Sequence, residues 1–110
     1  MSANSYAWSF LAASVIVEVA GNVALRYSHG FSRPLPTVIT CLCYATAILL
    51  MSLVVKHLEV GLTYAIWAGL GTALTSAIGM AIFNESKHPL RFAGLTLIIL
   101  GVIALNLTTT

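Results

Sequence analysis

The residue with the clearest chemical potential in this chain is Glu18, near the middle of an otherwise apolar run from Trp8 to Leu25. That run is long enough to cross a lipid bilayer as a helix. A carboxylate at the centre of such a helix costs roughly 2.5–3.5 kcal/mol on insertion scales. Acidic side chains at this depth face a protein interior or a water-filled cavity, and the default interpretation is a functional one. We therefore expect Glu18 to be the centre of a binding site.

Polar residues flank Glu18 at intervals of four. Ser14, Glu18 and Asn22 are therefore expected on one face of a helix, lining one pocket. Such a stripe is typical either of a proton and cation site or of a polar clamp between helices. A clamp needs only Ser or Asn, so the carboxylate favours the proton and cation site. A buried carboxyl can hold a proton or an organic cation without holding both. This exclusion couples proton movement to cation movement if the site faces each side of the membrane in turn.

Aromatic residues supply candidate walls for the pocket. Tyr64 and Trp67 are three residues apart and share a helix face. Aromatic rings attract cations, and a tyrosine hydroxyl can bond to a carboxylate. A position in the interfacial aromatic belt is the alternative for Tyr64. Tyr44 is a further candidate wall, and Gly69 and Gly71 permit close helix approach or a bend.

The last apolar run has the features of an association surface. Gly94 and Gly101 are seven residues apart and share a face, and no ionisable group follows Arg91. Small residues two turns apart let helices approach closely. We expect this run to hold two subunits together, the alternative being packing within one subunit.

The composition identifies the elements that must position these residues. Of 110 residues, 59% are hydrophobic and 7% are charged, whereas about 25% are charged in a soluble domain. The sequence predicts an all-α integral membrane protein, one domain over 1–110, with four spans at about 8–27, 36–55, 61–83 and 90–107. Short connections make sequential helices antiparallel neighbours in a small bundle. Such a bundle has little room for a polar site, so we expect self-association.

The positive charges predict an orientation. Four Lys and Arg residues flank the first and third connections, and Lys56 alone lies in the second. The positive-inside rule then favours the first and third connections in the cytoplasm of a bacterial cell, in a multi-pass inner-membrane protein. A mixed orientation stays open.

Other kinds of chemistry find little support. The net charge of +2 is too small to indicate nucleic-acid binding. Cys41 and Cys43 point to different sides of a helix, which argues against a bridge or a metal site. There is no phosphate-binding loop, metal cluster or nucleophile with a base, so we expect no enzyme and no cofactor beyond the coupling proton. Glu59 and Glu85 fall in connections and are expected to be solvated charges.

In this order and at this chain length, these residues resemble the small multidrug resistance family of transporters. The likeness covers essentially the whole chain. The residues that carry it are Glu18, Ser28-His29-Gly30-Phe31, Tyr64-Ala65-Ile66-Trp67 with Gly69 and Gly71, Gly94 and Gly101, then Asn106-Leu107. The resemblance implies an antiparallel dimer of four-helix subunits that exchanges protons for cations at the two glutamates. Tyr64 and Trp67 would line the site, and the last helices would hold the dimer together.

The resemblance also bears on the substrate. Guanidinium exporters of the family carry Trp one turn after the glutamate, where this chain has Gly21, as quaternary ammonium exporters do. We expect an exporter of lipophilic or quaternary ammonium cations that acts as a homodimer. Asn22-Val23 and Val55-Lys56 are similar to one partner of the paired polyamine exporters, so half of a heterodimeric polyamine exporter is an alternative. A non-transporting membrane assembly subunit is the alternative from another class.

Overall fold

The computed structural model describes residues 3–108, and that part of the chain forms helices and no strands. The helices are α1 (Ala3–Tyr27), α2 (Pro34–Val54), α3 (Val60–Ile82) and α4 (Pro89–Leu107). Each is long and apolar enough to cross a membrane. The fold class expected from the sequence, four membrane-spanning helices, is confirmed. The first two and last two residues of the expected domain lie outside the described residues.

Most helix ends lie within two residues of the expected ones, and the exception is the start of α1, at Ala3 rather than near residue 8. Hydropathy marks only the apolar stretch, and a helix can continue past it into polar residues. α2 and α4 begin with Pro34 and Pro89 in the first turn. Proline is favoured there because the first helical N–H groups have no partner within the helix.

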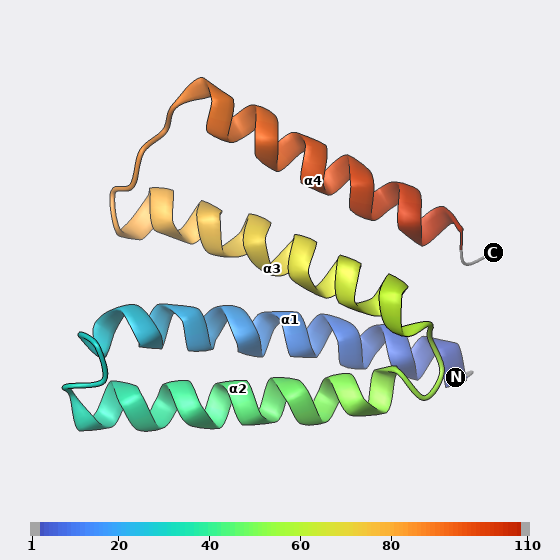
Figure 1. Ribbon diagram of the computed structural model, residues 1–110, viewed down its shortest axis with the longest axis horizontal. Helices are drawn as coiled ribbons and strands as arrows, with labels where there is room; N and C mark the ends of the chain where they lie inside the picture. Colours follow the sequence, from blue (N-terminus) through green and yellow to red (C-terminus); the bar gives the residue numbers. More distant parts are fainter. Residues whose placement is uncertain (1–2, 109–110) are drawn as a thin grey trace.

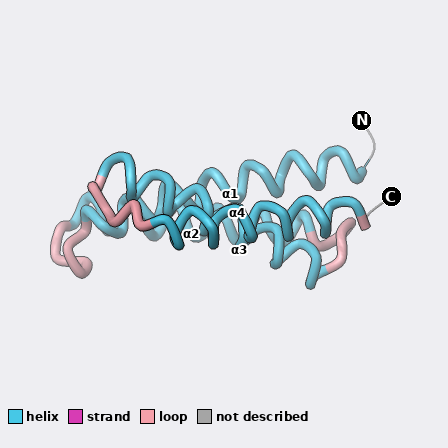
Figure 2. The backbone as a smooth tube through the Cα atoms, turned by 90° about the horizontal axis from the view of Figure 1, so that it is seen from above, coloured by secondary structure: helices cyan, strands magenta, loops and turns pink. Residues whose placement is uncertain are grey.

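The helices lie side by side in the order α2, α1, α3, α4, in a flattened arrangement of 43 × 35 × 21 Å (Figure 1). Seen from above, they form a shallow layer, from which the N-terminal half of α1 rises (Figure 2). α1 packs against both α2 and α3, and α4 packs against α3. The expectation of a small bundle with every sequential pair adjacent is therefore wrong for α2 and α3. α1 lies between them, and two of its faces pack against α2 and α3.

The connections are distributed between the two ends of this layer. Those after α1 and α3 lie at one end, and the connection after α2 lies at the other, with the start of α1 and the end of α4 (Figure 1). The flanking Lys and Arg residues of the first and third connections therefore gather at one end of the subunit. This charge asymmetry is the basis for the proposed orientation.

The core is small and centred on α1. Leu11, Val15 and Val19 of that helix are buried with Val54 of α2 and Ile66 of α3. α4 contains no buried residue. Most of the subunit surface is therefore apolar and exposed, as expected for contact with lipid or with another subunit.

The connection after α1 is a left-handed turn. His29, Gly30 and Phe31 have positive φ angles of 48°, 70° and 65°. Buried Ser28 holds this turn, since its Oγ donates to Leu25 O at 2.7 Å and accepts from Phe31 N at 3.2 Å. The Ser-His-Gly-Phe segment thus has a local structural role.

Candidate functional site

A hydrogen-bond network surrounds Glu18 at the junction of α1, α2 and α3. Asn22 Nδ2 donates to Glu18 Oε1 at 3.2 Å and to Thr75 Oγ1 of α3 at 3.0 Å. The Tyr44 hydroxyl of α2 donates to Asn22 Oδ1 at 2.5 Å. Asn22 therefore joins all three helices through its one side chain and fixes one oxygen of the Glu18 carboxylate.

The other carboxylate oxygen has no such partner. Glu18 Oε2 is buried and accepts no hydrogen bond within residues 3–108. It lies against Gly71, where any Cβ would collide with it. Gly71 therefore makes room for the carboxylate. Since buried polar atoms in proteins nearly always have partners, Oε2 has the capacity to interact with a further group in the cavity.

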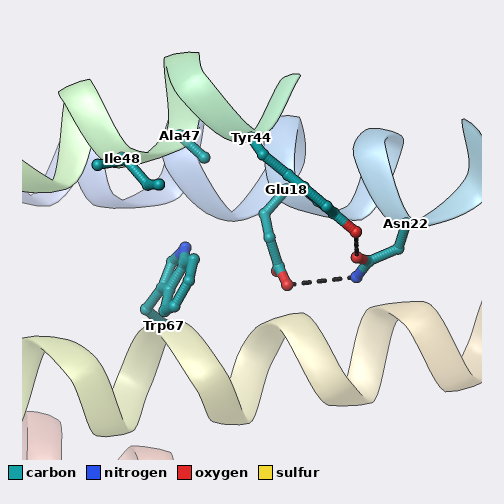
Figure 3. A pocket seen from close by; sticks show the side chains of 6 residues that line it. All are labelled: Glu18, Asn22, Tyr44, Ala47, Ile48 and Trp67. Atoms are coloured by element: carbon teal, nitrogen blue, oxygen red, sulfur yellow. Dashed lines mark hydrogen bonds between the residues drawn. The ribbon is translucent and has the colours of Figure 1, made fainter. Parts of the chain in front are cut away.

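Trp67 of α3 forms the wall opposite Glu18 (Figure 3). The two residues line a cavity of about 270 Å³ with Asn22, Tyr44, Ala47 and Ile48. The indole Nε1 is buried and has no hydrogen-bond partner among the described residues. The cavity therefore combines an apolar lining, an aromatic ring and an acidic group that is only half satisfied.

Tyr44 occupies space that Gly21 leaves open. A Cβ at residue 21 would lie 2.7 Å from Tyr44 Cε1, closer than a real contact allows. Any larger residue at position 21 would displace the Tyr44 ring and break its bond to Asn22. Glycine at position 21 and tyrosine at position 44 therefore depend on each other.

Two of the expected lining residues lie elsewhere. Ser14 is fully buried and its Oγ donates to Ala47 O of α2 at 2.9 Å, so it clamps α1 to α2 and does not line this cavity. The Tyr64 ring stacks obliquely on Trp67, with ring centroids 5.7 Å apart, but it is 61% exposed and also lies outside the lining. Its contact with cavity contents stays a prediction that requires a second subunit.

The glycines expected to permit packing differ in what they contact. A Cβ on Gly69 would lie 2.9 Å from Val102 Cγ2, so Gly69 allows α3 and α4 to approach. Gly94 and Gly101 have nothing within 4 Å of such a Cβ. Close packing within one subunit therefore does not require them, and they remain available for contact between subunits.

Two polar residues near Glu18 were missed by the sequence analysis. Thr75 receives the second hydrogen bond of Asn22. Glu85 lines a second cavity together with Glu18, and its side chain is still 37% exposed, as expected for a charge in a connection. The position of Thr75 among the small residues of α3, one turn after Gly71, could have indicated its role. The sequence does not indicate that of Glu85, because the turn after α3 brings this residue close to the site.

The fold and the site define a small multi-spanning membrane protein with an acidic, aromatic cavity between α1, α2 and α3. No group of three His, Cys, Asp or Glu residues within 3–108 is arranged to hold a metal ion. The lining places a carboxylate and an indole ring together, and both groups attract a positive charge.

Residues 6–98 match the family model described as Small Multidrug Resistance protein, and the chain belongs to this family of membrane exporters. It is similar to a guanidinium exporter of Escherichia coli (strain K12), with 40% identity over 93% of this chain and 97% of that one. It is also similar to the quaternary ammonium compound-resistance protein QacF of Klebsiella aerogenes, with 42% identity over 91% of each chain. The multidrug resistance protein EbrB of Bacillus licheniformis is 46% identical over 88% of this chain and 82% of that relative.

Proposed function

We propose that this protein is a proton-coupled antiporter that exports lipophilic or quaternary ammonium cations from a bacterial cell across its inner membrane. Proton and substrate compete for Glu18, and Trp67 contacts the bound cation. The observation that carries the proposal is the buried, unpartnered Oε2 of Glu18 in an aromatic cavity. A proton or a cation would each satisfy that oxygen, and neither can do so while the other is bound.

The geometry favours a diffuse cation over guanidinium. A guanidinium group pairs best with both oxygens of a carboxylate through two parallel hydrogen bonds. Here Oε1 already accepts from Asn22, which leaves one oxygen free. A quaternary ammonium or phosphonium ion donates no hydrogen bond and needs only negative charge and an apolar, aromatic wall.

Guanidinium export is a second candidate, because relatives with 40% identity are named guanidinium exporters. It requires Oε1 to accept from the substrate as well as from Asn22, which the second lone pair of that oxygen allows. Comparing guanidinium with tetraphenylphosphonium as competing ligands separates the two candidates.

Tetraphenylphosphonium binding to the purified protein should strengthen as pH rises. Protons compete with the cation for Glu18, so fewer bound protons leave more sites open. Calorimetry in two buffers of different ionisation enthalpy measures the affinity and the protons released on binding. We expect net proton release wherever Glu18 is protonated before binding.

The opposite results are equally clear. Binding that is independent of pH, with no proton release, contradicts competition at Glu18. No binding at any pH contradicts a homodimeric exporter of hydrophobic cations and favours the heterodimeric polyamine exporter. Reconstitution with a homologous partner chain would then be the next experiment.

We also propose that two copies of this chain form the transporter. The cavity of about 270 Å³ is smaller than the roughly 300–1,000 Å³ typical of ligand sites. The subunit is a thin layer, Tyr64 is 61% exposed, and α4 contains no buried residue. A second layer would enclose the cavity, place a second Glu18 close by and cover α4.

Replacing Gly101 with Leu should weaken this association while leaving the subunit folded. Nothing in the subunit lies near a Cβ at residue 101, so the added side chain would collide only with another chain. Energy transfer between labelled subunits in liposomes measures the association. Thr96→Leu is the control, because Thr96 is exposed and lies about 140° away around α4. Unchanged association of Gly101→Leu would show that α4 does not form the interface.

A further inference from the structure

A second cavity, of about 230 Å³, leads from Glu18 to the end of the subunit that carries the third connection. Glu18 and Asn22 bound it on one side, and Glu85 bounds it on the other. Between them its lining is polar and comes from one face of α3, contributed by Thr72, Thr75 and Ser76. This cavity therefore places polar side chains between Glu18 and that end of the subunit.

The backbone places Glu85 at the mouth of this cavity. After α3 the chain reverses at Asn84, whose φ is 54°, and Glu85 N donates to Gly79 O at 3.1 Å. The Glu85 carboxylate folds over Gly79, where a Cβ would collide with Oε1. The Glu85 carboxylate therefore has Gly79 on one side, while the side chain as a whole is 37% exposed.

Positive charges surround Glu85 at this mouth. Arg91 Nη2 lies 3.7 Å from Glu85 Oε1. Arg26 lines an adjoining cavity of about 80 Å³ with Glu85, and its guanidinium lies 5.0 Å from the centre of the Phe83 ring. Neither cavity includes Arg91 in its lining, so Arg91 reaches Glu85 from outside them. Removing the Glu85 charge would leave both guanidinium groups without this neighbouring carboxylate.

We propose that Glu85 is a residue of the cation pathway, which offsets the positive potential of Arg26 and Arg91 at the mouth of the cavity leading to Glu18. The inference rests on the proposed export of organic cations. Glu85 sets how fast a cation passes the mouth, whereas Glu18 sets how tightly it binds. A charge at a narrow entrance acts mainly on rates in this way.

The test is stopped-flow binding of tetraphenylphosphonium to the full-length protein in liposomes. Glu85→Gln should slow both association and dissociation by roughly three- to tenfold, at the lower end of electrostatic effects on such rates. The dissociation constant should change less than twofold, because Glu85 does not touch the bound cation. Added salt should reduce the difference from the native protein.

Arginine variants separate charge from structure. Arg91→Gln alone should accelerate binding, and Glu85→Gln combined with Arg91→Gln should restore rates close to native. Glu59→Gln is the matched control, because Glu59 is exposed and lies in the connection at the other end of the subunit. If the ion pair served only as a structural support, Arg91→Gln would also bind tetraphenylphosphonium more slowly.

The proposal is overturned if Glu85→Gln leaves the rates unchanged, or if Arg91→Gln is slower than the native protein. If Glu85→Gln does not fold, the direction of change in Arg91→Gln still decides. Failure of the proposed function looks different, since the native protein would then bind no tetraphenylphosphonium, or bind it independently of Glu18.

Discussion

Replacing Glu18 with Gln should abolish proton-driven cation export, reducing it to the leak of empty liposomes. Gln keeps the size of the side chain, and its carbonyl can still accept from Asn22 Nδ2. It carries no negative charge at the position of Oε2 and cannot exchange a proton. The measurement is tetraphenylphosphonium movement in proteoliposomes under an imposed pH gradient.

Glu59→Gln provides the control for this loss. It removes an equal charge from the connection between α2 and α3, far from the cavity, and should transport at the native rate. Both variants should keep native thermal stability, since neither change alters packing. Transport by Glu18→Gln that still responds to the pH gradient would contradict the assignment of Glu18 as the shared site.

The sequence predicts the four spans, and it draws attention to Glu18, because both depend on the chain's local composition. Four apolar runs of bilayer length allow one interpretation, and a lone carboxylate within a run is conspicuous. The order of the helices across the layer could not be predicted. It depends on which faces of α1 meet α2 and α3, and hydropathy does not distinguish these two apolar faces.

Helix geometry explains why Ser14 and Tyr64 lie outside the cavity. A spacing of four residues leaves a rotation of about 40°, so Ser14 and Asn22 differ by about 80° around α1. That difference turns Ser14 toward α2, whereas Asn22 reaches Thr75 of α3 as well as Tyr44 of α2. A spacing of three similarly rotates Tyr64 by about 60° from Trp67. Residues on one stripe can therefore contact different neighbours.

Replacing Gly71 with Ala should weaken cation binding at least tenfold with little change in stability. A Cβ at this position collides with Oε2 of Glu18, the end of a flexible side chain that can swing aside. The carboxylate would then leave its place opposite Trp67 and lose its hydrogen bond from Asn22. Gly71→Ala keeps every polar group of the site and changes only the position of the Glu18 carboxylate.

Gly61→Ala is the matched control, because Gly61 lies in the first turn of α3 with nothing within 4 Å of a Cβ. It should bind tetraphenylphosphonium like the native protein and gain up to about 1 kcal/mol of stability from the better helix former. Equal binding by both alanine variants would mean that the carboxylate functions equally well when displaced. A tenfold loss confined to Gly71→Ala would instead show that binding depends on where Glu18 is held, since its charge is present in both proteins.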